Sequence, residues 1–246
     1  MKRSSAFGGI KACANSLMSF FLPMLGPRAK IRMPFLILDI GCGTGALFPA
    51  LERYGSVSGI DISAEAVAYA RRRGGVTVRQ GEESRLPYDG NTFDVVACSD
   101  LLYHAQVADD GAVLAEIYRV LKPGGALIIK EAAYNWLRSR MDELVHTKRR
   151  YTVWELKRKI ESAHLRVERI TYCMSILFPL ALTVRLFERL HPPSYQATEL
   201  FTFPSVLNAL FAAIARAEAF LLRRLNFPFG LSIIAAARKP QALIAL

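Results

Sequence analysis

Glycines and carboxylates in the first third of the chain are spaced as a nucleoside site would need them. Gly41, Gly43 and Gly45 directly follow Phe35–Ile40, an apolar run of strand length. Glycines let the backbone turn sharply and let a ligand approach main-chain N–H groups at the start of a helix. Asp61 lies twenty residues beyond Gly41, where the next predicted strand ends. A carboxylate at that position can accept hydrogen bonds from two neighbouring ribose hydroxyls.

The same glycines also satisfy the loose dinucleotide pattern G-x-G-x-x-[GA], through Gly41, Gly43 and Ala46. A single match of this kind is weak. Two features argue against a nicotinamide-dependent dehydrogenase: Asp39 stands just before the glycines, and little sequence beyond the predicted sheet remains for a hydride-acceptor domain. We therefore expect a nucleoside ligand whose arm is charged but is not a phosphate.

The elements that must position these residues follow an α/β pattern. Apolar runs of strand length alternate with segments of helical period from about residue 35 to residue 130, which predicts a parallel sheet with crossover helices. Lys122-Pro123-Gly124-Gly125 should end a helix and turn into the fifth strand. The predicted strands are Phe35–Ile40, Val57–Ile60, Val76–Arg79, Phe93–Ser99 and Ala126–Glu131, and the predicted helices include Ala64–Arg73 and Gly111–Leu121.

The pattern changes after residue 131. Thr152 and Glu155 form a capping-box signature that predicts a helix to about Ala163. Strands are then expected at Leu165–Cys173 and Gly230–Arg238. Between them lie two apolar helical stretches, Leu177–Leu190 and Pro204–Leu225, which we interpret as a helical cap over the carboxyl edge of the sheet. The expected organisation is an N-terminal segment (1–33), a core (34–174 and 229–240) and the inserted cap (175–228).

Composition limits the class of protein. The 246 residues are 52% hydrophobic and 22% charged, enough apolar material for one large domain. The net charge of +11 is uneven: residues 1–118 carry 12 basic and 12 acidic side chains, residues 119–190 carry 15 and 7, and residues 191–246 carry 5 and 2. This excess suits nucleic acid, an anionic membrane or a phosphorylated substrate, and equally a solvated basic surface.

The cysteines and the apolar stretches bear on the cellular compartment. The four cysteines lie far apart, without the spacing of a zinc site or of a disulfide framework, so we expect a reduced, cytoplasmic protein that holds no metal. No stretch reaches the ~18 uninterrupted apolar residues of a membrane-spanning helix. The N-terminus imitates a signal peptide, but Lys11 and Asn15 interrupt it. We expect the N-terminal segment to pack against the domain or a membrane face.

Taken in order, the motifs resemble those of class I S-adenosylmethionine-dependent methyltransferases that act on small molecules. The resemblance covers about residues 35–173 and resumes at Phe229–Lys239. It implies an α/β, Rossmann-like sheet of seven mostly parallel strands whose last strand is antiparallel. The motifs that carry it are Asp39–Gly45, Asp61, Gly81–Pro87, Phe93–Val96 with Ser99–His104, and Arg119–Gly125.

The resemblance also implies which residues bind S-adenosylmethionine and its product, S-adenosylhomocysteine. The glycine loop would wrap the methionine portion, and Asp61 would bind the ribose. Glu82 would accept from the exocyclic amine of adenine and the backbone of Glu83 would bind a ring nitrogen, although the family usually has Asp where Glu82 stands. The expected cofactor contacts are Asp39, Gly41, Cys42, Gly43, Thr44, Gly45, Asp61, Ile62, Glu82, Glu83, Ser99, Asp100 and Leu101.

Methyl transfer to a phenol or hydroxyl is helped by a positioned base, and three residues are candidates. His104 follows the fourth strand, at the carboxyl edge where ligands of such sheets lie, and its imidazole can accept a proton near neutral pH. Alternatively, His104 only shapes the pocket or packs under the cofactor. His146 and Glu131 are the other two candidates.

His146 begins a His-x-x-Arg-Arg-Tyr-Thr stretch that looks like that of a bacterial methyltransferase subgroup. Its side chains would close over the substrate, with an arginine pairing to a carboxylate or phosphate. An equally weighted alternative is a structural helix connection whose arginines bind carbonyls and whose tyrosine packs. The expected substrate contacts are Tyr103, His104, Arg149, Arg150 and Tyr151.

The cap bears on the substrate and the partners. Its apolar residues outnumber those that a narrow core-facing stripe requires, so some must face a pocket, a partner or lipid. We expect a hydrophobic small-molecule acceptor, such as a lipid-, isoprenoid- or polyketide-like natural product. Peripheral membrane contact and a homodimer interface are both open. The residues expected to flank the apolar faces at an anionic interface are Arg185, Arg189, Arg216, Arg223 and Arg224.

Two rival functions are retained. The first is an RNA or other nucleic-acid methyltransferase. No nucleic acid is expected as partner, however, because the loop after the fourth strand lacks the Asn/Asp-Pro-Pro-Tyr/Phe tetrapeptide that holds a flipped base in amino-methylating enzymes. The second is a non-catalytic partner protein that binds the cofactor without transferring its methyl group.

Overall fold

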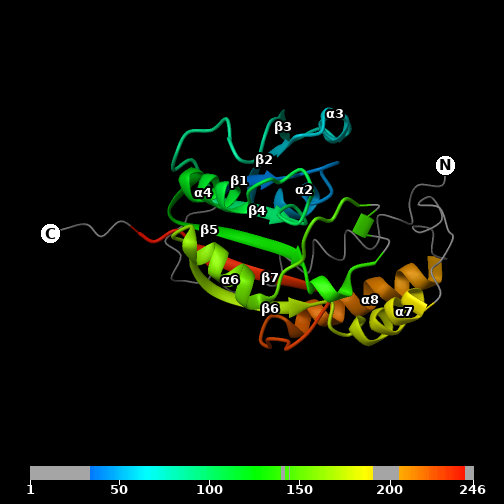
Figure 1. Ribbon diagram of the computed structural model, residues 1–246. Coiled ribbons are helices and arrows are strands. Elements are labelled where there is room, and N and C mark those ends of the chain that lie inside the picture. The colour runs from blue at the N-terminus through cyan, green and yellow to red at the C-terminus, as the bar shows by residue number, and fades with distance from the viewer. Residues whose placement is uncertain (1–33, 140–141, 144, 191–204, 242–246) are drawn as a thin grey trace.

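Seven strands form one sheet in the described part of the chain, in the order β3-β2-β1-β4-β5-β7-β6 (Figure 1). The computed structural model describes residues 34–139, 142–143, 145–190 and 205–241, so the expected N-terminal segment lies outside the described residues. The strands are β1 (Phe35–Ile40), β2 (Gly55–Asp61), β3 (Thr77–Gln80), β4 (Phe93–Ser99), β5 (Leu121–Ala132), β6 (Arg166–Cys173) and β7 (Ser232–Arg238).

The direction of the strands confirms the predicted fold class. β1 to β5 pair in parallel, whereas β7 is antiparallel to both of its neighbours, β5 and β6. β1, β4 and β5 are buried almost throughout, as expected of parallel strands that are covered on both faces. Their continuous apolar runs made them visible in the sequence.

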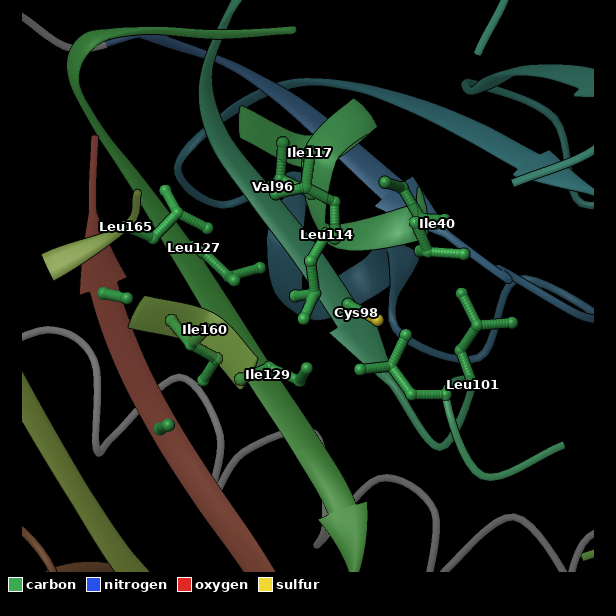
Figure 2. Packing of buried hydrophobic residues seen from close by; sticks show 14 of the residues in the cluster. Ile40, Val96, Cys98, Leu101, Leu114, Ile117, Leu127, Ile129, Ile160 and Leu165 are labelled. Carbon is green, nitrogen blue, oxygen red and sulfur yellow. The ribbon is translucent and has the colours of Figure 1, made fainter. Parts of the chain in front are cut away.

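Helices cover the two faces of the sheet. α4 (Asp110–Val120) and α6 (Val153–Ser162) lie on one face, and Figure 2 shows Leu114, Ile117 and Ile160 packed against Val96 and Leu127. α2 (Phe48–Leu51) and α3 (Ala64–Arg71) pack on the other face. Side-chain caps mark the start of α3, α4 and α6. The predicted capping box is present, with the Thr152 N–H donating to Glu155 Oε2 at 2.7 Å and the Glu155 N–H donating to Thr152 Oγ1 at 3.3 Å.

The helix expected after the glycine loop is present as the four-residue α2, which begins at Phe48, after Gly45 at φ +74°. One local expectation was wrong. The Lys122–Gly125 turn lies inside β5 rather than before it. Leu121 already pairs with Phe93, and the pairing register then shifts by the time Val95 meets Ala126. Gly124, at φ +80°, supplies the left-handed backbone of this irregularity.

The insertion between β6 and β7 contains α7 (Phe178–Leu190) and α8 (Ser205–Leu221). Both helices lie at the end of the molecule toward which β5 and β6 point (Figure 1). The Ile176 N–H, just before α7, donates to Glu218 Oε2 of α8 at 3.0 Å. None of the helices in the described ranges has the length and apolarity of a transmembrane span.

Candidate cofactor and acceptor site

The chemistry-bearing residues converge on the carboxyl edge of the central strands. Ile40 of β1 pairs with Cys98 of β4, and Cys98 pairs with Ile129 of β5. The loops that follow these strands therefore emerge side by side. This edge is where ligands of open α/β sheets bind.

The glycine loop is fastened to the end of β2. The N–H groups of Gly41 and Cys42 both donate to the Ile60 carbonyl, at 2.9 and 3.0 Å. The Gly43 N–H donates to Asp61 Oδ2 at 2.8 Å, while the Ser63 N–H donates to Asp61 Oδ1 at 2.9 Å. Each carboxylate oxygen can accept two hydrogen bonds, so Asp61 keeps capacity for a pair of hydroxyls.

Two of the loop glycines are required for different reasons. Gly41 has φ +67°, which L side chains rarely adopt, and a Cβ there would lie 2.8 Å from Leu101 Cδ1, so the Leu101 side chain would have to shift. Gly43 has φ +52°, and no heavy atom lies within 4 Å of the position that its Cβ would take. The loop is therefore packed at Gly41 and open at Gly43.

Asp39 is the least satisfied polar residue at this edge. Its side chain is 1% exposed, and its Oδ2 has no hydrogen-bond partner. Burial, with a further contribution from the charge of Asp61, raises the pKa of Asp39 to about 8. Buried carboxyls are normally paired, so this one fits a site that receives a positively charged group.

The carboxyls after β3 differ from each other in burial. Glu82 is exposed, and its Oε1 accepts a hydrogen bond from Ser84 Oγ at 2.7 Å. Glu83 is buried, and that burial raises the pKa of its carboxyl despite backbone N–H groups that stabilise the charge. Sequence reasoning assigned a role to the side chain of Glu82 and to the backbone of Glu83. The structure adds the buried side chain of Glu83, which feels the charge of Asp61.

The loop after β4 is held by two residues of β5. Lys130 Nζ donates to both carboxylate oxygens of Asp100, at 2.8 and 2.6 Å, and Asp100 takes the left-handed φ of +58°. The carboxylate of Glu131 accepts N–H groups from Leu101, Leu102 and Tyr103 at 3.3, 2.9 and 3.2 Å. Ser99 Oγ also donates to Asp100, at 3.1 Å.

Glu131 is fully buried, and burial raises its pKa to about 8, with Asp100 adding to the shift and the backbone N–H groups opposing it. These three N–H contacts assign Glu131 to positioning the loop, and they do not favour its candidacy as the base.

His104 and His146 lie together near the same loop, with ring centroids 5.9 Å apart in an edge-to-face arrangement. Burial and the neighbouring His146 lower the pKa of His104, which favours the neutral ring. The Gln106 N–H donates to His104 Nδ1 at 3.3 Å, so in the neutral ring Nε2 carries the proton. In this arrangement, His104 presents a hydrogen-bond donor rather than a base. His146 is exposed, and it takes φ +54°.

The three residues after His146 that were expected over the substrate are bonded within the protein. Arg149 Nη1 donates to Asp110 Oδ2 at 2.9 Å. Arg150 Nε donates to Asp142 Oδ1 at 2.7 Å, and its Nη1 donates to the Ala133 carbonyl. Tyr151 Oη lies 2.9 Å from Asp110 Oδ2 and 3.1 Å from the Leu102 carbonyl oxygen, and its single proton is available to either acceptor. These contacts favour the structural alternative, a connection that ties α4 to the loop after β4.

Residues 38–129, which hold the glycine loop, Asp61, Glu83 and the loop after β4, match a family model described as a methyltransferase domain. This segment is a class I methyltransferase domain. Its family depends on S-adenosylmethionine as the methyl donor. The match ends inside β5, before Glu131 and before the cap.

Two curated relatives are similar to part of this chain. A demethylmenaquinone methyltransferase of Lactiplantibacillus plantarum is 37% identical over an alignment of 108 residues that covers 39% of this chain and 45% of the relative. A ubiquinone biosynthesis O-methyltransferase of Xylella fastidiosa is 38% identical over an alignment of 100 residues that covers 38% of this chain and 40% of the relative. The chain thus spans less than half the length of these relatives.

A solved structure extends the likeness in fold beyond the matched segment. A putative sarcosine dimethylglycine methyltransferase from Galdieria sulphuraria has a TM-score of 0.61 to this chain. It is 18% identical, and the alignment covers 93% of this chain and 85% of that one. At this identity the comparison shows the fold, including the region after β5.

One feature of the methyltransferase edge was missed by sequence reasoning, an aromatic cluster. Tyr134 stacks on Tyr172 with ring centroids 4.9 Å apart and an interplanar angle of 19°. Phe178, at the start of α7, lies edge-on to Tyr134 at 6.2 Å and contacts Phe229 at 5.3 Å. Trp136 joins the cluster 5.4 Å from Tyr134.

The signal for this cluster was present in the sequence. Tyr134 and Tyr172 stand at or just after strand ends, and Phe229 stands just before the last strand begins. Ala132, Ser232 and Cys173 pair across these three strands, so the aromatic residues must meet at one edge. Aromatic rings that meet at a ligand-binding edge are a common wall for apolar ligands.

Proposed function

We propose that this methyltransferase domain transfers a methyl group from S-adenosylmethionine to a hydrophobic small molecule that is lipid-, isoprenoid- or polyketide-like. The observation that carries the proposal is the buried carboxyl of Asp39 and its unpartnered Oδ2, at the base of the glycine loop. A carboxylate in a site of low dielectric strongly favours a cationic ligand over a neutral or anionic one. S-adenosylmethionine supplies a methyl group on a positively charged sulfur.

In this proposal, different residues bind different parts of the cofactor. Asp39 offers its charge to the cationic portion, and the open side of the loop at Gly43 leaves room for the methionine arm. Asp61 accepts from the ribose hydroxyls with the capacity that Gly43 and Ser63 leave. Glu83 and the backbone after β3 face the adenine end, and the half-buried Tyr103 helps to exclude water.

In this proposal the acceptor lies against the aromatic cluster of Tyr134, Tyr172, Phe178, Trp136 and Phe229. Flat aromatic walls favour an acceptor that carries a ring or an extended apolar chain. The names of the two curated relatives, which concern menaquinone and ubiquinone, support such an acceptor. His104 would donate a hydrogen bond from Nε2–H to the acceptor oxygen. The exposed His146 beside it would take up the proton that the acceptor hydroxyl loses when it is methylated.

Transfer to a lipophilic acceptor can be tested with labelled cofactor. The purified protein is incubated with S-adenosylmethionine carrying a radiolabelled methyl group and with a cell extract split into organic, aqueous and nucleic-acid fractions. We expect label in the organic fraction. Label confined to the aqueous or nucleic-acid fraction would refute the acceptor class, and cofactor binding without label in any fraction would identify a non-catalytic partner protein.

A matched pair of variants links the transfer to the site. Asp39→Asn should lose labelling, whereas Asp89→Asn, which changes an exposed carboxyl after β3, should keep it. Equal loss in both variants would contradict the assignment of Asp39.

A further inference from the structure

α7 turns Arg185 toward the protein and a row of apolar side chains outward. Leu180, Val184, Phe187 and Leu190 recur at helical spacing along one face, and all four are exposed. Arg185 lies on the opposite face, where its Nη1 is 3.6 Å from Asp142 Oδ2. The sequence had suggested Arg185 as a flank of the apolar face, and its inward position corrects that expectation. A surface helix normally has the reverse arrangement.

α8 likewise presents apolar side chains to the outside. Val206, Leu210 and Phe220 are exposed at helical spacing. Glu218 is buried, where its carboxylate accepts the Ile176 N–H in front of α7. The buried Glu218 thus joins the two helices, and both present apolar side chains to the outside. Apolar side chains exposed together on neighbouring helices mark interaction surfaces in many soluble proteins.

The exposed charge around these faces has one sign. Among the side chains described in 174–190 and 205–230, Arg216, Arg223 and Arg224 are exposed. The two acidic residues of the same ranges are half-buried Glu188 and buried Glu218. Apolar side chains flanked by arginines are the composition of helices that lie in the interface of an anionic membrane.

We propose that the outward faces of α7 and α8 dock the protein on the surface of a membrane that contains anionic lipid. The apolar side chains would enter the boundary between headgroups and acyl chains, and the arginines would bind lipid phosphates. This inference goes beyond the proposed function, because it concerns where the protein sits and not what it methylates. It is also consistent with an acceptor that is dissolved in lipid.

Two other occupants of this surface are a second copy of the chain and the chain's own residues 1–33, and charge disfavours both. A symmetric dimer would bring the same arginines of two +11 chains together, with no exposed carboxylate of these helices to pair with them. The chain's own residues 1–33 contain Lys2, Arg3, Lys11, Arg28, Lys30 and Arg32 and no Asp or Glu, so they would add charge of the same sign. Of the three occupants, anionic lipid is the one whose charge complements the arginines.

Vesicle sedimentation tests the proposal with the full-length protein and without cofactor or acceptor. Vesicles of phosphatidylcholine are compared with vesicles that also contain phosphatidylglycerol. We expect binding to the phosphatidylglycerol vesicles, weakened at high salt, and little binding to pure phosphatidylcholine. Because the readout is not catalytic, failure of this test and failure of the proposed function are distinguishable.

Variants locate the contact. Leu180→Asp combined with Phe220→Asp should weaken vesicle binding at least about tenfold, because each change removes an apolar side chain from the interface and adds a repelled charge. Arg223→Glu combined with Arg224→Glu should abolish the preference for phosphatidylglycerol. The control is Trp154→Asp, which changes an equally exposed apolar residue on α6, 73% exposed, and should leave binding unchanged.

Three results would overturn the proposal. The first is an absence of binding to phosphatidylglycerol vesicles. The second is an equal loss of binding in the Trp154→Asp control. The third is a dimer in analytical ultracentrifugation that Phe220→Asp dissociates, because the surface would then belong to a second copy of the chain.

Discussion

The glycine loop and the stretch from His146 to Thr152 were both expected to bind a ligand, yet they differ in how many of their polar groups already have partners within the protein. In the glycine loop, Asp39 Oδ2 is buried without a partner and Asp61 retains acceptor capacity. In the later stretch, Arg149 and Arg150 donate to buried carboxylates and to backbone carbonyls.

This difference teaches how to separate a binding site from a framework that resembles one. Arginine, histidine and tyrosine at close spacing suggest substrate recognition. They can bind a ligand only where their hydrogen-bonding groups have no partners within the protein. Residues 149–151 use their hydrogen-bonding groups to hold α4, the loop after β4 and the segment after β5 together. Asp39 differs from these residues, because its carboxyl is buried and its Oδ2 has no partner within the protein, so it can pair with a cationic ligand.

Arg150→Met should have the largest effect, and on stability rather than on binding. Arg150 and Asp142 form a buried pair, and removal of one partner from such a pair costs about 3–5 kcal/mol. Thermal unfolding of Arg150→Met should occur at a clearly lower temperature, while Arg158→Met, on the exposed side of α6, stays close to the parent. An unchanged melting temperature with lost transfer would make Arg150 a substrate residue and break the comparison.

Asp39→Asn should act in opposite directions on binding and on stability. Loss of the charge should weaken S-adenosylmethionine binding about tenfold or more, measured by calorimetry. The pKa of Asp39 is raised from 3.8 to about 8 in the folded protein, so ionisation destabilises the fold increasingly as the pH rises from about 4 toward 8. Asparagine removes this penalty, and the variant should melt above the parent at pH 8 and by a smaller margin at pH 5. A variant that is less stable at pH 8 would show that Asp39 has a structural partner.

Two substitutions of His104 distinguish the roles of its two ring nitrogens. His104→Asn keeps an acceptor near Nδ1 for the Gln106 N–H but loses Nε2, and we expect kcat to fall about tenfold or more. His104→Gln places a polar atom near Nε2 and should retain more activity. Cofactor affinity should be unchanged in both. Equal kcat in the parent and His104→Asn would leave His104 with a packing role only.

Tyr151→Phe should have the smallest effect. It removes a buried hydroxyl that bonds to Asp110 and to the Leu102 carbonyl, which should cost about 1 kcal/mol of the unfolding free energy in urea. Tyr69→Phe, at a partly exposed ring on α3, is the control and should be neutral. If Tyr151→Phe kept its stability but lost most of its methyl transfer, the Tyr151 hydroxyl would have to be assigned to acceptor binding.

The sequence predicted the framework well, because its signals are local. β1 and β4 were predicted at their observed bounds, and the box of Thr152 and Glu155 marked the start of α6. The antiparallel last strand came from the family resemblance, which the sheet confirms. Periodicity and capping depend on neighbours along the chain, and a single sequence shows those directly.

What the sequence did not predict depends on contacts between distant segments. Lys130 binds Asp100, and Glu131 binds three N–H groups about thirty positions earlier, so neither role has a local signature. Arg185 was expected on the outside of α7, but Asp142 draws it inward. The cofactor contacts and the cap's function as a cover over the acceptor stay predictions, and so does the division of the chain into core and cap.

The central claim is that Asp39 meets a cationic nucleoside in the glycine loop. The most direct measurement is calorimetry of S-adenosylmethionine binding to the full-length protein between pH 6 and pH 8, in buffers of different ionisation enthalpy. We predict one site per chain, with affinity that rises with pH and with proton release at pH 7, because binding favours the ionised carboxyl. An absence of binding heat, or identical pH dependence in Asp39→Asn, would contradict the account.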